Sequence, residues 1–439
     1  MVCVSGNCSS WIGISTLSIC TDYSANLDVS SGEKATIQNL PLNSELSIDY
    51  TSSAWFVSLV VGSSTNWYVT SRINTMIRPD GYINSSPIAV TLPIIYKQIN
   101  TQHVHVVQMV DFDRTDILKC RWSTASGNIN SYNECGGVCN GVPGALLISN
   151  NCTLQFTLTI ANMFVAVAIQ IEDYYNNAAT TPMSSVPLQF LFYGYPIPSG
   201  CTTPPAIIGV RPNRACVGTP IGVTVTEIVV VQTFCSATSI VEFITTSPVV
   251  HDKLIILLIY LIFFVGIYQI TLSWVPSASQ YGTQGLCAAA VDNSSIQSNQ
   301  WCIAYLVGFT APQFIQSSAT PVGNVYANQS VFLIQADKPV GRPSRNGTYI
   351  YFYDATTGGS LVQRFDCGSA PEVTYAGYTI TIRFSVIPWI TGHSYYITFD
   401  SGMFELLFIY IPFLNKSHPL YHILGVASGL DACGKSLFI

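Results

Sequence analysis

Charged side chains are scarce in this sequence. Lys, Arg, Asp and Glu make up 9% of the 439 residues, against about a quarter in ordinary soluble proteins. The 17 basic residues form no cluster and the formal net charge is −6, so the chain lacks the basic patch that nucleic-acid binding requires. We therefore exclude nucleic acid as a partner.

Local motifs of catalysis are missing too. The sequence has no Gly-x-Ser-x-Gly, His-Glu-x-x-His, P-loop or Gly-x-Gly-x-x-Gly, and it contains only six His residues. We therefore predict that the protein is not an enzyme. Four glycines lie within 136–144, among several cysteines. They favour a disulfide-stapled loop, because a phosphate cradle needs a preceding strand and a following helix.

Helical periodicity is nearly absent, whereas short alternating segments bounded by Gly, Pro, Asn and Ser recur along the chain. This pattern predicts an all-β protein. In 165–173, branched residues alternate with a second face that carries Gln170 and Glu172, which predicts a half-buried strand with an acidic end. The segment from Asp354 to Gly359 predicts a hairpin turn.

Polar or Pro-rich segments near 96–102, 196–205 and 316–323 mark candidate domain boundaries. They divide the chain into an N-terminal β domain of unassigned fold and three β-sandwich domains, followed by a tail: 1–100, 101–197, 206–315, 320–402 and 403–439.

The cysteines indicate the compartment. Fourteen are scattered over the whole chain, with no Cys-x-x-Cys pair that would suit zinc, so we expect disulfides in an oxidising environment. Cytosolic free thiols are the alternative. The candidates are Cys3, Cys8, Cys20, Cys120, Cys135, Cys139, Cys152, Cys201, Cys216, Cys235, Cys287, Cys302, Cys367 and Cys433.

Seven Asn-x-Ser/Thr sequons agree with secretion, although a chain this rich in Asn, Ser and Thr produces several by chance. The glycosylation candidates are Asn7, Asn84, Asn151, Asn293, Asn328, Asn346 and Asn415. We therefore predict an extracellular or cell-surface location. The first twenty residues lack the basic region of a signal peptide. We therefore interpret the sequence as the product of a truncated gene model or as an internal fragment.

Two apolar runs interrupt the strand pattern. The run at 254–275 is long enough to span a bilayer, but sequons and cysteines lie on both sides of it, which disfavours membrane association. The second, at 403–424, contains a shorter apolar stretch. Three interpretations stay open: translated intron or lineage-specific inserts near 254–269 and 403–424, a membrane helix at 254–275, or a buried element.

Two segments resemble cadherin-like, immunoglobulin-type repeats. The first match consists of the acidic turn 110–116, the following Arg121-Trp122, the strand 168–173 and the strand 184–190. The second consists of 272–276, 280–282 and 288–293, with Trp-x-Pro, a Gly turn and Ala-x-Asp. The resemblance implies tandem Ig-like or cadherin-like β-sandwich domains.

Two further resemblances concern the rest of the chain. The segment 320–402 resembles the Ig-like domain of bacterial S-layer proteins through Asp337-Lys338-Pro339-Val340 and the segment 392–397, Gly-His-Ser-Tyr-Tyr-Ile. The chain also resembles a group of large invertebrate extracellular proteins, through segments 119–122 (Lys-Cys-Arg-Trp) and 134–139 (Glu-Cys-Gly-Gly-Val-Cys).

Calcium is the metal that the acidic turn suggests, because Ca²⁺ takes six to eight oxygen ligands including several carboxylates. The candidate ligands are Asp111, Asp113 and Asp116, completed by Glu172 and Asp173. An Asp-rich solvated turn is the alternative. Asp292 is a weaker candidate. His103 and His105 share one strand face, and we interpret them as half-exposed strand residues rather than a metal pair.

These observations predict a non-enzymatic extracellular modular protein of adhesive or structural function, with calcium stiffening the array. Its partners would be other extracellular proteins or glycans. Two alternatives remain. Exposed aromatic residues would suit a carbohydrate-binding surface protein, and a helix at 254–275 would suit a membrane-anchored receptor ectodomain.

Overall fold

The computed structural model describes residues 1–400 and 405–406, except 25, 28, 35, 56, 112–115, 209–210, 212, 214, 236–237, 248–255, 262–264, 311 and 344–346. The described residues form β-strands and three short 3₁₀ helices, Gly136–Val138, Ser149–Asn151 and Ala278–Gln280, with no α-helix among them. The prediction of an all-β protein is confirmed.

The chain divides into two compact units. The first contains Met1–Ala215 and Pro220–Gly308, and the second contains Cys216–Thr219 (β16) and the described residues from Phe309 onward.

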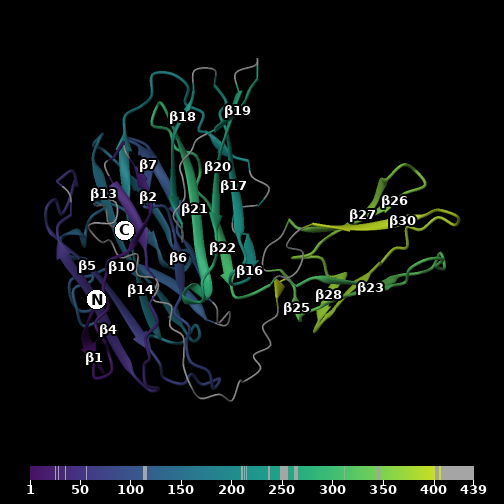
Figure 1. Ribbon diagram of the computed structural model, residues 1–439, viewed down its shortest axis with the longest axis horizontal. Helices are drawn as coiled ribbons and strands as arrows, with labels where there is room; N and C mark the ends of the chain where they lie inside the picture. Colours follow the sequence, from purple (N-terminus) through teal and green to yellow (C-terminus); the bar gives the residue numbers. More distant parts are fainter. Residues whose placement is uncertain are drawn as a thin grey trace. The chain divides into compact units, whose positions relative to one another are not determined.

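A seven-stranded sheet dominates the first unit. Its strand order is β1-β4-β5-β14-β13-β10, with β7 parallel to β14 (Figure 1). The strands are β1 (Val2–Gly6), β4 (Glu45–Ser53), β5 (Asn66–Asn74), β7 (Ile94–Gln98), β10 (Ile117–Trp122), β13 (Phe164–Tyr174) and β14 (Ser184–Tyr195).

This sheet corrects the domain boundary predicted near residue 100. Strands from 1–100 and from 101–197 belong to one sheet, in which both β5 and β7 pair with β14. Side chains also join the two segments: Trp67 Nε1 donates to Gln189 Oε1 at 2.6 Å. The polar segment 96–102 is not a linker: it contains the end of β7, a short turn at 99–101 and the start of β8 (Gln102–Val106). Its Ile99 and Asn100 amides donate to the carbonyls of Tyr195 and Leu158, which ties the turn into the sandwich.

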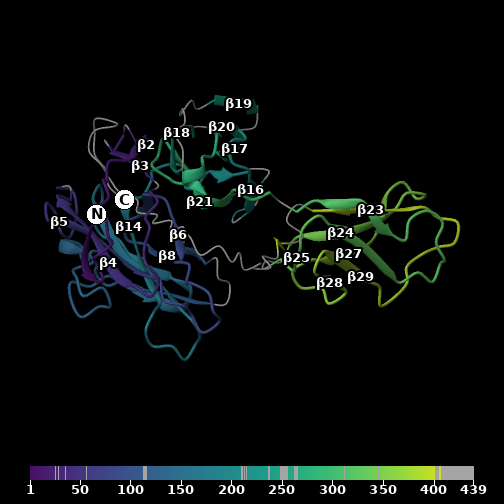
Figure 2. The same cartoon turned by 60° about the horizontal axis from the view of Figure 1, so that its bottom comes forward.

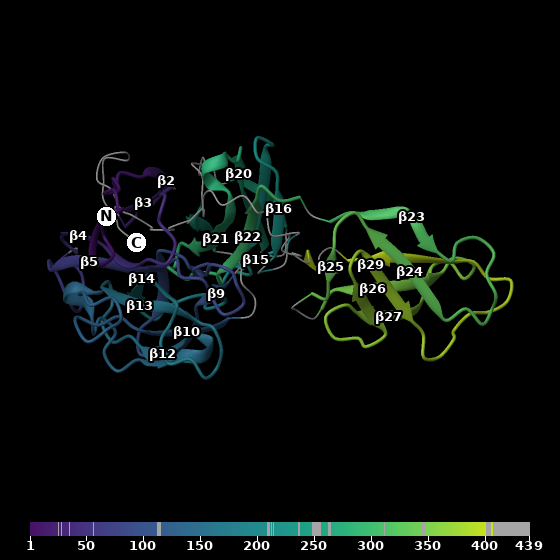
Figure 3. The same ribbon diagram turned by 90° about the horizontal axis from the view of Figure 1, so that it is seen from below.

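Smaller sheets oppose the large one. One has the order β11-β12-β8 and another pairs β6 with β9; their strands are β6 (Ile88–Val90), β8 (Gln102–Val106), β9 (Gln108–Val110), β11 (Leu146–Ile148) and β12 (Thr153–Thr157) (Figure 3). Phe156 of β12 stacks on Phe192 of β14 with ring centroids 4.1 Å apart. Stacked aromatic rings of this kind bury large apolar areas, so this contact lies at the centre of the first core.

A second sandwich completes the first unit. One sheet has the order β15-β17-β20-β19, and β18, β21 and β22 are neighbours in another. The strands are β15 (Ala206–Ile207), β17 (Val225–Gln232), β18 (Ile240–Thr246), β19 (Ile256–Leu261), β20 (Val265–Trp274), β21 (Gly282–Asp292) and β22 (Trp301–Val307). The hairpin of β2 (Ile19–Ser24) and β3 (Val29–Glu33) forms a two-stranded sheet of its own.

The first apolar run is therefore not a membrane helix in its described part. Its residues 256–261 and 265–274 are β19 and β20, and β20 pairs with β17 from Trp274 through Ile267. Branched and aromatic residues, which make the run apolar, also favour strands. None of the described residues forms a helix long and apolar enough to cross a bilayer. Strand β20 begins inside the proposed insert 254–269.

Of the second apolar run, 403–424, only Glu405–Leu406 (β31) is described. This strand pairs with Val340–Gly341 (β25).

The two sandwiches of the first unit interlock through side chains. Gln300 Oε1 accepts hydrogen bonds from Thr91 Oγ1 at 3.0 Å and from the Leu92 amide at 3.2 Å. Gln297 Oε1 accepts from the Tyr96 amide at 3.1 Å, and its Nε2 donates to the Ile94 carbonyl at 3.2 Å. One continuous cluster of buried apolar residues includes members of both sandwiches. They therefore form one packed body.

The N-terminal hairpin strengthens this connection. Asp22 of β2 is buried, and its Oδ2 accepts from both the amide and the Oγ1 of Thr245 in β18, each at 2.8 Å. Hydrogen bonds to a charged acceptor are the strong ones, so the first residues of the chain help to hold the second sandwich.

The second unit is a separate sandwich. One sheet has the order β23-β24-β29-β28 and the other β27-β26-β30 (Figure 2); the strands are β23 (Phe314–Thr320), β24 (Val331–Ala336), β26 (Tyr349–Asp354), β27 (Ser360–Asp366), β28 (Val373–Ala376), β29 (Thr379–Arg383) and β30 (Tyr395–Phe399). The predicted hairpin is confirmed: β26 pairs with β27, and Gly358 and Gly359 take positive φ angles of 80° and 86°, which favour glycine.

The expectation of disulfides is confirmed. Among the described residues the pairs include Cys3–Cys8, Cys120–Cys152, Cys135–Cys139, Cys201–Cys235 and Cys287–Cys302. Cys20 is also disulfide-bonded. Cys367 differs from the prediction, because it is a buried free thiol whose pKa burial raises to about 11. Cys433 lies outside the described residues.

The interlock predicts a local change in hydrogen exchange. The variant Gln300→Ala removes the acceptor of the Leu92 amide, so exchange at Leu92 should accelerate while Tyr96, held by Gln297, stays protected. The matched variant Gln297→Ala should reverse the pattern. Equal protection at Leu92 in the wild type and Gln300→Ala would contradict the interlock.

Candidate metal centre

Three of the predicted calcium ligands come together at one end of the first sandwich. Asp111 follows β9, Asp116 precedes β10, and Asp173 lies near the end of β13. Strand pairing places them there, because Asp173 is opposite Leu118 in β10 and opposite Ser184 in β14. One carboxylate oxygen from each of the three lies within 4.8 Å of the others. Asp113 lies outside the described residues.

Asp173 is the most buried of the three carboxylates, with no exposed surface. Its Oδ1 accepts from the Ser184 amide at 2.6 Å and from Ser184 Oγ at 2.8 Å, and its Oδ2 accepts from Asn84 Nδ2 at 2.5 Å. Burial raises the pKa of this carboxyl, and the hydrogen bonds from Asn84 and Ser184 oppose that rise. Neighbouring hydrogen-bond donors therefore orient Asp173 toward the cluster.

Asn84 supplies the observation that tests whether a cation fits. Its side chain is 4% exposed, and its Oδ1 is buried with no hydrogen-bond partner among the described residues. An amide oxygen is a ligand that Ca²⁺ accepts beside carboxylates. A buried acceptor without a partner is costly, and this one belongs to a side chain that already contacts the cluster. The donor set of three carboxylates and an amide fits a hard cation.

Arg78 is the resident counter-charge. Its Nη2 lies 2.7 Å from Asp116 Oδ1 and 3.1 Å from Asp80 Oδ2, and the turn from Arg78 to Tyr82 holds it in place through the Arg78 amide and the Tyr82 carbonyl, 2.7 Å apart. Arg78 therefore compensates part of the negative charge of the cluster at Asp116.

Glu172, the fifth predicted ligand, does not join the cluster. Successive side chains of a strand point to opposite faces, so Glu172 and Asp173 are turned away from each other. Glu172 Oε1 instead lies 2.7 Å from Arg121 Nε, and its Oε2 accepts from the Tyr174 hydroxyl at 2.8 Å. Its assignment as a calcium ligand beside Asp173 is wrong for this geometric reason.

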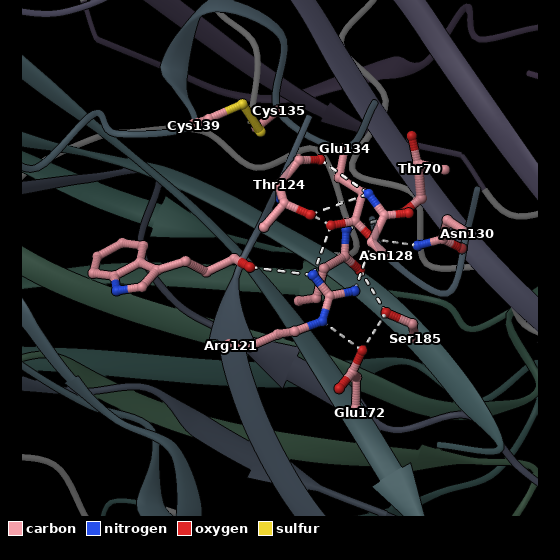
Figure 4. Close-up of polar contacts among 12 residues, drawn as sticks. Thr70, Arg121, Thr124, Asn128, Asn130, Glu134, Cys135, Cys139, Glu172 and Ser185 are labelled. Atoms are coloured by element: carbon pink, nitrogen blue, oxygen red, sulfur yellow. Dashed lines mark hydrogen bonds and ion pairs between the residues drawn. A yellow bond between two sulfur atoms is a disulfide. The ribbon is translucent and has the colours of Figure 1, made fainter. Parts of the chain in front are cut away.

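The group that holds Glu172 is a buried polar network (Figure 4). Arg121 binds Glu134 through both terminal nitrogens, each 2.7 Å from a carboxylate oxygen. Glu134 is fully buried and also accepts from Asn130 Nδ2 at 2.6 Å and from the Thr124 amide at 3.0 Å. Such bidentate Arg–carboxylate pairs are among the strongest side-chain contacts. The segments 119–122 and 134–139, which carry the whole-chain resemblance, thus meet in this network.

The loop after the network is stapled as predicted. Cys135–Cys139 closes it, and Gly137 lets its backbone approach the start of β5, because a Cβ at this position would overlap Thr65, the residue before that strand. The loop covers the polar face of β13, so Gln170 and Glu172 are buried. The expectation of a half-buried strand at 165–173 is therefore wrong: both of its faces are covered.

The remaining metal candidates have structural roles. Asp292 Oδ1 accepts from the Ser294 and Ile296 amides at 2.9 and 2.8 Å, which closes a turn. His103 and His105 lie in β8 as expected. His105 is more buried than expected: it is 8% exposed and packs on Phe190 and Phe192. No metal cluster among the described residues includes either histidine.

The sequons differ in accessibility. Asn84 is buried with Nδ2 on Asp173, so it does not offer the exposed amide that an oligosaccharide needs. Four others are exposed: Asn7, Asn151, Asn293 and Asn328. Asn346 and Asn415 lie outside the described residues.

Comparisons with known proteins name no family. No family model and no curated protein matches the sequence. Among solved structures, the sialic-acid-binding region of a Streptococcus sanguinis adhesin aligns over 58% of this chain and 93% of its own, with 9% identity and a TM-score of 0.17. Tandem Ig domains of titin align over 51% and 97%, with 7% identity and a TM-score of 0.17. Two extracellular cadherin domains of human protocadherin-24 align over 51% and 99%, with 14% identity and a TM-score of 0.17. TM-scores this low support no inference about function.

Burial of His105 predicts a pH dependence. Burial, with a smaller contribution from Lys97, lowers the pKa of His105 to about 3, whereas the unfolded chain takes up this proton near pH 6.5. The stability contributed by neutral His105 is therefore present above pH ~6.5 and lost as the pH falls toward ~3, by about 1.4 kcal/mol per pH unit. In denaturant unfolding between pH 6 and 4, His105→Leu should flatten this slope, and His103→Gln should flatten it less. If the free energy of unfolding of His105→Leu varied with pH as steeply as that of the wild type, buried His105 would not be the cause of the pH dependence.

Proposed function

We propose that the chain is a non-enzymatic extracellular protein that holds adhesive or structural modules at a fixed spacing. The observation that carries this proposal is the interlock of Gln297 and Gln300 with the segment 91–96. Sandwich domains joined only by a linker move relative to each other, whereas a continuous core and paired amides make a stiff body. Disulfides and exposed sequons support the extracellular location.

Calcium would add to this stiffness at the acidic cluster. Asp111, Asp116 and Asp173 would provide carboxylate oxygens and Asn84 would provide an amide oxygen. The cation would link the turn between β9 and β10 to the end of β13. In its absence the carboxylates repel one another, with Arg78 as partial compensation.

Calcium binding should appear as a thermal shift. A ligand that binds only the folded state at about a hundred times its Kd stabilises by ~2.7 kcal/mol, so Ca²⁺ should raise the Tm of the metal-free protein. Asp111→Asn and Asp173→Asn should abolish the shift. Glu172→Gln, the matched control, should lower the starting Tm and keep the calcium shift. No shift in the wild type, or a full shift in Asp173→Asn, would overturn the calcium proposal.

Adhesion itself is tested on beads. Beads coated with the chain should aggregate, or bind cells that display a partner, and aggregation should increase with Ca²⁺ and fall in Asp173→Asn. Beads that remain dispersed under all conditions would contradict self-adhesion, leaving the spacer function to be tested by the rigidity of the first unit.

A carbohydrate-binding function is the second candidate. Tyr349, Tyr351 and Tyr353 alternate along one face of β26, and Tyr353 stacks on the exposed Tyr396 of β30 with centroids 5.1 Å apart. Aromatic side chains of this kind can pack against sugars. Binding on a glycan array that is lost in Tyr396→Ala would favour this function, and an array without signal would exclude it for the sugars tested.

A further inference from the structure

One sequon of the second unit lies in a defined turn. The Gln329 amide donates to the Tyr326 carbonyl at 3.0 Å, so Tyr326 is the first residue of a β-turn and Asn328 is the third. Ser330 completes the sequon. Asn328 is exposed, and the side chain of Tyr326 is 84% exposed. The aromatic ring therefore lies two residues before the acceptor amide, on the same turn.

The turn is anchored to the sandwich below it. Trp389 Nε1 donates to the Gln329 carbonyl at 2.6 Å, and the Phe384 amide donates to the Ser330 carbonyl at 2.8 Å. Trp389 in turn packs on Phe332 and Phe384. The backbone on which Tyr326 and Asn328 stand is thus fixed by the hydrophobic core of the unit.

The surroundings of this turn are apolar and uncharged. Val322 and Val386 are 73% and 79% exposed, and the segments 321–330 and 385–394 contain no Lys, Arg, Asp or Glu. The two segments are joined by the hydrogen bonds of Trp389 and Phe384, and we call their exposed apolar side chains Val322, Tyr326 and Val386 the loop patch. Exposed apolar side chains gathered on neighbouring loops, unlike single ones, favour a surface that is covered.

We propose that Asn328 carries an N-linked oligosaccharide whose first sugar packs on the ring of Tyr326 and covers the loop patch. The reaction transfers the sugar from a lipid-diphosphate-linked oligosaccharide. The bond from Asn328 Nδ2 to the sugar C1 forms, the C1–O bond to the lipid diphosphate breaks, the lipid diphosphate leaves, and Nδ2 loses one proton. The proposal rests on the extracellular location given under the proposed function.

An oligosaccharide suits this surface better than a lipid or a protein. The C–H faces of a pyranose pack on aromatic and aliphatic side chains without needing a charged partner, and the loop patch offers none. The sequon itself is the second argument. A sugar at Asn328 stands two residues from Tyr326, the most exposed member of the patch, so it would occupy the surface that another partner needs.

Occupancy is tested on the full chain, secreted from eukaryotic cells behind an added leader, by mass spectrometry of its glycopeptides. We expect Asn328 to be occupied. The exposed sequons Asn7, Asn151 and Asn293 are internal references. If they are occupied and Asn328 is not, the present proposal fails alone. If none of the four is occupied, the proposal fails and the secreted-glycoprotein assignment loses its support.

Packing of the sugar on Tyr326 is tested by stability. Asn328→Gln should lower the Tm of the second unit by ~2–5 °C, and enzymatic trimming to a single sugar should retain most of the difference. In a Tyr326→Thr background, Asn328→Gln should have almost no effect. Tyr378, a tyrosine 51% exposed in the turn between β28 and β29, is the matched control, because Tyr378→Thr should leave the effect of the glycan intact. An equal effect with and without Tyr326 would overturn the packing, as would binding of the secreted protein to neutral phosphatidylcholine vesicles through Tyr326.

Discussion

The structure of the first sandwich depends on the burial of two carboxylates against one partly exposed guanidinium. Arg121 on β10 reaches Glu134 in the loop after it and Glu172 on β13. A buried charge is tolerated only when it is paired and hydrogen-bonded, so these three side chains must meet for the loop 123–145 to close over the sheet. The Cys135–Cys139 disulfide and Gly137 give the loop the shape to do so. The same closure buries the polar face of β13, and the strand that carries Glu172 inward also carries Asp173 to the acidic cluster.

Many of the few charged side chains of this protein are buried rather than exposed at its surface. Nine of the described acidic residues are buried: Asp22, Asp49, Glu134, Glu172, Asp173, Glu227, Glu242, Asp292 and Asp354. A large part of the acidic charge is thus placed inside the chain. Asp22 joins the hairpin to the second sandwich, and Glu227 lies 2.8 Å from Arg211. A surface of low charge leaves Ser, Thr, Asn and Tyr to make contacts, which agrees with the proposed spacer or adhesive function.

Local patterns predicted the local structure. The strands, the hairpin at 354–359 and the stapled loop follow from alternation, glycines and cysteines. The meeting of Asp111, Asp116 and Asp173 agrees with what the cadherin-like resemblance implied, and their binding of calcium stays a prediction. The errors concern long-range contacts. The turn near residue 100 looks like a linker because its hydrogen-bond partners, at 158 and 195, are far away in sequence. Arg78 and Asn84 are 33 and 27 residues before Asp111, so no spacing rule connects them with the cluster. The sequence did contain an indication of the role of Glu134. In a chain with 9% charged residues, a Glu directly before two closely spaced cysteines favours a structural ion pair with an Arg or Lys.

A double-mutant cycle on Arg121 and Glu134 tests the role of this pair most directly. Chemical denaturation would give the free energy of unfolding of the wild type, Arg121→Met, Glu134→Leu and the double variant. Arg121→Met leaves the fully buried Glu134 carboxylate without its cation and should cost about 3–5 kcal/mol. Glu134→Leu leaves the partly exposed Arg121 paired with Glu172 and should cost less. The double variant should cost well below the sum of the two single variants, a coupling of ~2 kcal/mol or more. Additive losses, or single losses below ~1 kcal/mol as at exposed ion pairs, would contradict the account.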